Sequence, residues 1–201
     1  MKRLAILLMI CAVLIVSCGP KTPSMNEQIF LAVQQTVAAI PTYTPYPPPP
    51  IATPPSLNGL FCEYQFCIGH PADMAFFDVS AQRDPTAPST PALGLLAAYN
   101  TNLFIQLMWQ SAPGVSDPQF MLDLVVDNRV DTRSGGLNPL LVGDLNIYYV
   151  PITTTASAVL PYGGGAAWIC GGRAFAWKTY TSQSDLAKNL LSEALEKFRC
   201  Q

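Results

Sequence analysis

The sequence predicts an α+β domain in which an antiparallel sheet carries a middle helix and a C-terminal amphipathic helix, with disulfides stabilising the fold. Three observations predict it. Two apolar runs flank Gly171-Gly172, which is typical of a two-residue β-hairpin turn. Residues 140–152 alternate like a half-buried strand, and residues 182–199 place their leucines on one side of a helix. Successive strands with helices set apart indicate an antiparallel sheet.

The first part of this domain, which begins near Leu57, is predicted to consist of strands. Aromatic residues are frequent between 60 and 68, where we expect a strand or tight hairpin around two cysteines. Residues 74–79 predict a short apolar strand, and the prolines of 83–91 predict a loop. Two further runs, 93–100 and 103–111, flank Asn100-Thr101-Asn102 and predict a second hairpin.

The middle of the domain combines a helix with one long strand. Ser116-Asp117-Pro118 has the composition of a helix start. Residues 127–139 are polar and predict a loop, 140–152 predict the strand, and 153–165 predict mostly loop, with Gly163-Gly164-Gly165 as turn glycines. The apolar stripe expected on the helix is Phe120, Met121, Leu124 and Val125.

The C-terminal helix is predicted to begin at a cap formed by Ser182 or Ser184 and to run to about Arg199. Glu193 and Lys197 are four residues apart, which predicts an ion pair on the helix surface. The apolar face consists of Leu186, Leu190, Leu191, Leu195 and Phe198. The resulting order of elements is similar to that of the fold shared by the photosystem subunit PsbP and the nuclear import factor Mog1, a likeness of element order alone.

The chain begins with a pattern typical of export. Lys2 and Arg3 precede an unbroken apolar run from residue 4 to residue 16, which is too short to span a bilayer. Ile15-Val16-Ser17-Cys18 resembles the lipobox of bacterial lipoproteins. The resemblance implies that residues 1–17 are a signal peptide, and that Cys18 becomes the N-terminus and receives lipid on its sulfur and amino group.

Two segments separate this cysteine from the domain. Residues 18–40 contain a short juxtamembrane helix, which Ser24 and Glu27 are placed to cap; alternatives are a helix in the headgroup layer or a self-association element. Residues 41–57 form a proline-rich stalk, with eight prolines between positions 41 and 55. Polyproline II geometry at about 3.1 Å per residue gives an arm of roughly 45 Å. The globular domain is then residues 58–201.

Four cysteines remain after export, which predicts two disulfides in an oxidising compartment. Three pairings are possible. We favour Cys62–Cys67 as a local staple and Cys170–Cys200 as a link between the last strands and the C-terminal helix. The second closes a loop of about 30 residues and stabilises by roughly 3 kcal/mol in the chain-entropy model.

Charge limits the partners of the domain. After residue 57 there are eight lysines and arginines against twelve aspartates and glutamates, and the basic residues do not cluster. This excludes a nucleic-acid footprint. The partners we expect are a membrane, through the N-terminal lipid, and a protein or glycan of the cell envelope; we expect no cofactor. The location is the cell membrane or outer membrane, with the domain on the extracytoplasmic side.

His70 is the only histidine, so any Ser-His-Asp or Cys-His mechanism requires it, with Asp73 close in sequence. No Gly-x-Ser-x-Gly turn is present to hold a nucleophile. A histidine bonded to backbone in a turn is the simpler interpretation. The leading hypothesis is therefore a non-enzymatic, lipid-anchored binding or envelope-organising protein; the alternative is an envelope hydrolase or metal-dependent enzyme centred on His70 and Asp73.

A zinc site, a calcium site and an aromatic binding surface are further possibilities, and each has a structural alternative. Cys62, Cys67 and His70 could hold zinc with Cys170 or Asp73, although exported thiols tend to oxidise. Asp123, Asp127, Asp131 and Asp144 invite a calcium site, but Arg129 and Arg133 alternate with two of them, which favours local Asp–Arg pairing on a solvated loop. Six aromatic residues gather in the last strands: Tyr148, Tyr149, Trp168, Phe175, Trp177 and Tyr180. Trp168, Phe175 and Trp177 are expected in the core. If part of the set faces outward, it could form a carbohydrate or peptide surface.

Overall fold

The computed structural model describes Ser24 and residues 55–200. The predicted signal peptide, Cys18, the juxtamembrane helix and nearly all of the stalk lie outside these residues. The helices and strands are, in order, β1 Gly59–Glu63, β2 Phe66–His70, β3 Phe77–Asp78, α3 Val79–Arg83, β4 Leu93–Tyr99, β5 Leu103–Ser111, α4 Gln119–Val125, β6 Asp131–Arg133, β7 Asn138–Val142, β8 Leu145–Thr154, β9 Tyr162–Cys170, β10 Arg173–Thr181, α5 Leu186–Glu196 and β11 Arg199–Cys200.

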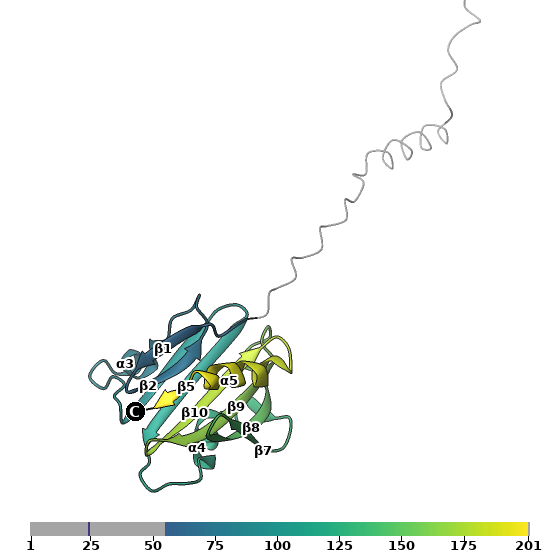
Figure 1. Ribbon diagram of the computed structural model, residues 1–201. Helices are drawn as coiled ribbons and strands as arrows, with labels where there is room; N and C mark the ends of the chain where they lie inside the picture. Colours follow the sequence, from purple (N-terminus) through teal and green to yellow (C-terminus); the bar gives the residue numbers. More distant parts are fainter. Residues whose placement is uncertain (1–23, 25–54, 201) are drawn as a thin grey trace, which may run out of the picture. The chain divides into compact units, whose positions relative to one another are not determined.

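The domain is built on an eight-stranded sheet in the order β3-β4-β5-β10-β9-β8-β6, with β7 also pairing β8. A small sheet of three strands, β1-β2-β11, lies beside it (Figure 1). Every strand pair in the described residues is antiparallel. The predicted α+β class is therefore confirmed.

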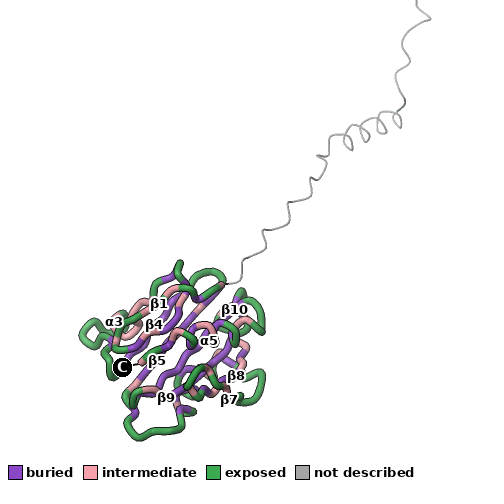
Figure 2. The backbone as a smooth tube through the Cα atoms, viewed as in Figure 1, coloured by how far each residue is buried: buried purple, intermediate pink, exposed green. Residues whose placement is uncertain are grey.

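The large sheet is covered on both faces, which makes three layers. On β10, Phe175 and Trp177 belong to a core cluster that includes α5 and β2. Ala174 and Ala176, which point the other way, belong to a second cluster that includes α4. Alternate residues of a strand face opposite sides, so α5 and α4 pack on opposite faces of the sheet. Figure 2 shows the central strands as buried and the connecting turns as exposed.

The predicted hairpins β4–β5 and β9–β10, which are neighbours in the sheet, are confirmed. Gly171 and Gly172 have φ angles of 58° and 69°, as a type I′ turn requires at both central positions. Strands β4 and β5 flank the expected asparagine turn, where the Asn100 side chain accepts hydrogen bonds from the backbone N–H groups of Asn102 and Leu103 at 2.8 and 2.9 Å. The hairpin predicted around the first two cysteines is β1–β2.

The region 153–165, predicted as mostly loop, is loop only between β8 and β9; the prediction that its glycines form a turn is wrong, because β9 begins at Tyr162 and contains all three of them. Gly164 lies under the ring of Tyr149, and a Cβ added there would approach that ring to 2.5 Å. Gly163 and Gly165 lie opposite Tyr180 and Lys178 of β10. These glycines provide space for large neighbours inside the sheet and do not form a turn.

The polar stretch 127–139 was also predicted as loop throughout, whereas it contains β6 and the start of β7. The single strand predicted over 140–152 is a hairpin, because Gly143, with a φ of 57°, turns the chain between β7 and β8. Of the strand predicted over 74–79, only β3 forms, and its last residue caps α3.

Both long helices form, with different bounds and partners. In α4, Met121 and Val125 are buried as expected, but Leu122 is buried in place of Leu124, which is 56% exposed. Helix α5 is shorter than predicted, its N-cap is Asp185, and Arg199 lies in β11. Leu190, Leu191 and Leu195 face the core as predicted.

The predicted Glu193–Lys197 ion pair is replaced by contacts with the start of the domain. Glu193 accepts hydrogen bonds from the Ser56 hydroxyl and the Leu57 backbone N–H at 2.7 and 2.8 Å. Lys197 donates to the Leu57 carbonyl at 2.8 Å, and Leu57 itself is fully buried. Among the helices that the structure describes, none is long and apolar enough to cross a membrane.

Candidate functional site

The three-stranded sheet places both disulfides and two arginines at one corner of the domain. In its register, Cys62 lies opposite Cys67, and Cys67 lies opposite Arg199. Directly opposed residues share a face of a sheet, so these three side chains form a row across the sheet. The neighbouring pair, Phe66 and Cys200, faces the other side. The two residues of β11 therefore lie on opposite faces of the small sheet.

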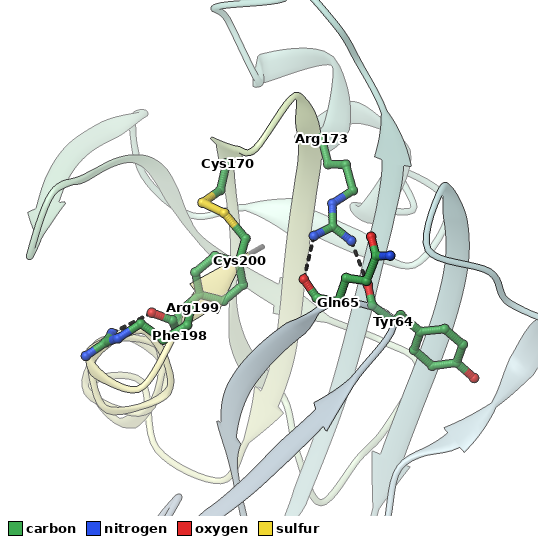
Figure 3. Close-up of a disulfide and its surroundings, with 7 residues drawn as sticks. All are labelled: Tyr64, Gln65, Cys170, Arg173, Phe198, Arg199 and Cys200. Atoms are coloured by element: carbon green, nitrogen blue, oxygen red, sulfur yellow. Dashed lines mark hydrogen bonds between the residues drawn. A yellow bond between two sulfur atoms is a disulfide. The ribbon is translucent and has the colours of Figure 1, made fainter.

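Both predicted pairings are confirmed. Cys62 is bonded to Cys67, with Cα atoms 4.1 Å apart, and Cys170 is bonded to Cys200, with Cα atoms 6.2 Å apart. The second bond connects the end of β9 to β11 (Figure 3). The sulfurs of Cys62 and Cys67 are bonded to each other, so the alternative in which they bind zinc as thiolates is wrong.

The turn between β1 and β2 has an unusual backbone. Tyr64 and Gln65 have φ angles of 51° and 62°, the left-handed region that residues other than glycine rarely adopt. The guanidinium of Arg173 donates to the carbonyls of Tyr64 and Gln65, each at 2.7 Å, and to the carbonyl of Pro91 at 3.2 Å. Figure 3 shows Arg173 reaching from β10 to this turn. One buried cation thus binds the tip of the hairpin to the large sheet.

Aromatic rings complete the surroundings of Arg173. The guanidinium carbon lies 5.9 Å from the ring centroid of Phe66 and 5.3 Å from that of Phe175. Such cation–π contacts stabilise a cation that is shielded from water. Arg173 is only 6% exposed, and burial lowers the pKa of its guanidinium. Its contacts with backbone carbonyls identify a structural cation at this corner.

Two hollows open on either side of β11 and share Arg199 as a wall. The larger has a volume of about 580 Å³, and the smaller has about 230 Å³. Arg199 donates to the carbonyl of Glu196 at 3.2 Å and also to the carbonyl of Phe198. The larger hollow is lined by Val142, Gly143, Asp144, Leu145, Cys170, Leu195, Glu196, Phe198, Arg199 and Cys200, and the smaller by Cys62, Glu63, Gln65, Phe66, Cys67 and Arg199.

His70 and Asp73 lie away from these hollows. His70 ends β2, is partly buried, and has its ring centroid 5.6 Å from that of Phe76. Its Nδ1 atom is buried without a hydrogen-bond partner, so the expected backbone bond at this nitrogen is absent from the described part of the chain. Asp73 is exposed. No hydrogen bond within residues 55–200 joins the two side chains.

Three of the four aspartates considered for calcium are paired with basic side chains in the folded domain. Asp127 pairs with Arg129 at 3.1 Å, and Asp123 pairs with Arg133, so the predicted Asp–Arg pairing is confirmed for these residues. Asp131 is not on a solvated loop but is 4% exposed. Over the described ranges, no group of three or more histidine, cysteine, aspartate or glutamate side chains is placed to hold a metal ion.

Asp131 instead forms a buried network with β10. Its carboxylate accepts from Lys178 at 3.2 Å, from the Tyr180 hydroxyl at 2.7 Å and from the Asp127 backbone N–H at 3.0 Å. Burial, followed by the hydrogen bond to Asp131, raises the pKa of the Tyr180 hydroxyl. Lys178 is 5% exposed, and its ammonium also lies 5.2 Å from the ring centroid of Tyr180. The network therefore stabilises the sheet.

The aromatic residues of the last strands are mainly in the core. Trp168, Phe175 and Trp177 are fully buried, as predicted, and Tyr149 and Tyr180 are buried too. Trp168 and Phe175 stack with ring centroids 5.6 Å apart. This leaves Tyr148, which is partly exposed and lines a separate hollow near α4. The aromatic set thus does not form the carbohydrate or peptide surface that we considered.

Sequence reasoning missed three residues that organise the corner and the sheet. Arg173 follows the Gly171-Gly172 turn, and Asp131 and Lys178 are 47 positions apart. Nothing local in the sequence marks their partners. An arginine or lysine inside an apolar strand of a weakly charged domain is nevertheless a signal, because such residues are almost never buried unless they are paired.

The domain is similar to known proteins in its structure and not in its sequence. No protein-family model matches the chain, and no curated protein matches its sequence. The solution structure of cyanobacterial PsbP (CyanoP) from Synechocystis sp. PCC 6803 is similar, with a TM-score of 0.50, 8% identity, and coverage of 76% of this chain and 96% of that chain. The chain therefore has a PsbP-like fold, as the element order predicted.

A second solved structure is less similar. A crystal structure from Bacteroides thetaiotaomicron VPI-5482 has a TM-score of 0.44 and 12% identity, covering 68% of this chain and 45% of that chain. It carries no argument about this chain. The likeness to CyanoP, at 8% identity, shows the fold only.

Proposed function

We propose that this protein is a lipid-anchored extracytoplasmic protein whose PsbP-like domain binds a protein or glycan partner in the cell envelope. Cys18 is the anchor, residues 41–57 are the spacer, and the domain binds the partner. The observation that carries the proposal is the combination of the lipobox-like Ile15-Val16-Ser17-Cys18 with two disulfides in the folded domain.

Disulfides support this location because they form and persist in oxidising compartments. All four cysteines that follow Cys18 are paired, two by two. The anchor requires more than one acyl chain, since a single chain binds a membrane only marginally. The sequence pattern implies lipid at both the sulfur and the amino group of Cys18, which meets that requirement.

The disulfide corner is the surface that we assign to the partner. Its two hollows have volumes of about 580 and 230 Å³, and their walls are cross-linked to the sheet by Cys170–Cys200 and by Arg173. A pre-formed surface binds with a smaller cost in ordering. Asp144, Glu196 and Arg199 supply charge around apolar walls, which suits a partner with both polar and apolar groups.

The location is tested by expressing the full chain and a Cys18→Ala variant in a bacterial host that processes lipoproteins. We expect the wild type in the membrane fraction and the variant in the soluble extracytoplasmic or unprocessed fraction. A Cys11→Ala variant is the matched control, because it removes a cysteine that the predicted cleavage discards. A Cys18→Ala protein that has lost residues 1–17 and still associates with membranes as strongly as the wild type would contradict the anchor.

Binding is tested with the mature lipidated protein in intact envelopes. Cross-linking followed by mass spectrometry should recover the same partner from the wild type and from Asp73→Ala, which lies outside the corner. Glu196→Lys should reduce the yield severalfold, because it reverses a charge on the wall of the larger hollow. A recovered partner that is insensitive to Glu196→Lys would place binding on another surface and overturn the assignment to this corner.

A further inference from the structure

We propose that the Cys62–Cys67 disulfide is a thiol–disulfide exchange site that oxidises a dithiol, whereas Cys170–Cys200 is a structural cross-link. This activity is additional to partner binding and does not depend on it. The two bonds lie on opposite faces of the small sheet. Cys67 of β2 belongs to the first bond, and Cys200 of β11 belongs to the second. Their surroundings differ in access, in nearby charge and in what the bond holds together.

Access favours the first bond. Cys62 is exposed, whereas Cys67, Cys170 and Cys200 are partly buried. The hollow of about 230 Å³ contains both Cys62 and Cys67 in its wall. Disulfide exchange requires an attacking thiolate to reach one sulfur, and this hollow opens the bond to such an attack.

Charge favours departure of the Cys67 sulfur. Arg199 lies directly opposite Cys67 in the β2–β11 register and lines the same hollow. A neighbouring guanidinium stabilises a thiolate, and a more stable thiolate leaves faster. Glu63 lines this hollow too, so its wall has one cationic and one anionic side chain, and the Arg199 guanidinium also donates to the carbonyls of Glu196 and Phe198.

The hairpin itself is suited to survive the loss of the bond. Strands β1 and β2 pair over five residues, and Arg173 binds the carbonyls of Tyr64 and Gln65 in the turn. These contacts remain when the disulfide opens, so the two thiols stay close and can be oxidised again.

Cys170–Cys200 has the opposite character. It joins residues 30 positions apart and connects β11, which consists of two residues, to the end of β9. Loss of a bond that closes a long loop destabilises the folded state more than loss of a short one. We therefore expect it to resist reduction as long as the domain is folded.

The exchange is balanced as a two-electron transfer. A thiolate of the dithiol attacks the Cys62 sulfur, a mixed disulfide forms, and the Cys62–Cys67 bond breaks with Cys67 leaving as a thiolate into the hollow that Arg199 also lines. The second thiolate of the dithiol then attacks the mixed disulfide and releases Cys62. The dithiol is oxidised to a disulfide, and its two protons are transferred to the thiolates of Cys62 and Cys67.

The test uses the mature lipidated protein in detergent, treated with increasing dithiothreitol and then with iodoacetamide. Peptide mass mapping reports which cysteines are alkylated, and tryptophan fluorescence reports the fold. We expect Cys62 and Cys67 to be alkylated at concentrations at least tenfold below those that open Cys170–Cys200, with fluorescence unchanged. Simultaneous reduction of both bonds, earlier reduction of Cys170–Cys200, or reduction only on unfolding would each overturn the proposal.

The role of Arg199 is tested by the rate of exchange at limiting dithiothreitol. If losing the cation raises the pKa of the leaving thiol by about one unit, a Brønsted slope of about 0.5 predicts that Arg199→Gln slows exchange about threefold. Arg199→Lys should restore most of the rate. Arg129→Gln is the matched control, since Arg129 is 87% exposed and pairs with Asp127. Equal rates in wild type and Arg199→Gln would contradict the role assigned to the cation.

Discussion

The ring of Tyr149 lies against the backbone of Gly164, and this contact decides why a glycine occupies the middle of a central strand. An added Cβ would come within 2.5 Å of the ring and 2.6 Å of the hydroxyl. Burial of the same side chain raises the pKa of the Tyr149 hydroxyl to about 12. The aromatic side chain thus covers backbone that glycine leaves open.

Gly164→Ala should lower the free energy of unfolding by about 1–3 kcal/mol, because a methyl group is forced into a packed site. Urea denaturation measures the change. Gly136→Ala is the matched control, since nothing lies within 4 Å of the added Cβ; it should leave stability unchanged or slightly higher. Equal stability of Gly164→Ala and wild type would contradict the close packing described here.

Arg173 is a second residue whose contacts stabilise the fold. Arg173→Met keeps much of the volume but leaves the carbonyls of Tyr64, Gln65 and Pro91 without this donor. An unsatisfied buried acceptor costs about 1–3 kcal/mol, but Gln65 is exposed and water can replace the donor there, so we expect a loss of roughly 2–4 kcal/mol in urea denaturation. Arg129→Met, at an exposed position, should have no measurable effect. A stability loss no larger than that of this control would contradict the structural role of Arg173.

Residues of this kind mark the limit of what the sequence predicts. The Gly171-Gly172 turn was predictable because both glycines serve a local backbone requirement. Gly164 was misread as a turn residue because its reason is the Tyr149 ring, which is brought close only when β8 pairs with β9. In the same way Asp131 was assigned to a solvated loop because its partner, Lys178, is distant in sequence.

Among the elements, short α3 is held by one carboxylate. Asp78 accepts from the backbone N–H groups of Ala81 and Ser89 at 3.1 and 2.8 Å, and from the Ser89 hydroxyl at 2.7 Å. Burial by itself would raise the pKa of Asp78, but these hydrogen bonds outweigh burial and lower the pKa below its usual value. They tie the helix to the loop that leads into β4.

This lowered pKa predicts a pH dependence with a definite sign. The ionised form is favoured in the folded state, so its contribution is fully present above the unfolded pKa of about 4. It is lost as the pH falls through the lower pKa of the folded state. The stability difference between wild type and Asp78→Asn should therefore shrink on acidification from pH 5 to about pH 2. A constant difference over that range in urea titrations would contradict the assigned hydrogen bonds.

Strand β6 is attached to the sheet by a buried ion pair as well as by backbone pairing. Lys178→Met leaves the Asp131 carboxylate without its cation and should cost about 3–5 kcal/mol in urea denaturation. Replacing both partners, as Lys178→Met with Asp131→Leu, should recover much of that loss, because no unpaired charge remains. A double variant that is no more stable than Lys178→Met would contradict this interpretation of the pair.

Element prediction succeeded where the signal was local. The β4–β5 and β9–β10 hairpins and the apolar face of α5 follow from turn residues and periodicity. The split of 140–152 into β7 and β8 was missed although Gly143 supplies the positive φ that a two-residue turn requires. The exposed Leu124 was placed in the core because Leu122 satisfies the helix period equally well, and only the position of the sheet decides between them.

On the scale of the whole molecule, we propose that a processed and lipidated N-terminus precedes the disulfide-containing PsbP-like domain. The domain begins where Glu193 and Lys197 bind the backbone of Leu57. The sequence before this point carries the predicted anchor and spacer, and the folded residues carry the corner at which we place binding and exchange. The number of cysteines predicted two disulfides, and their spacing favoured the observed pairing among the three possible ones. The hollows beside them were not predictable, because β11 reaches Cys67 only in the folded chain.

The most direct test of the central claim is the intact mass of the native protein extracted from membranes, measured before and after reduction. The account predicts a chain that begins at Cys18, carries covalent acyl groups at that residue, and gains on reduction the hydrogens of two disulfides. An unprocessed N-terminus at Met1, with Cys18 unmodified, would contradict it.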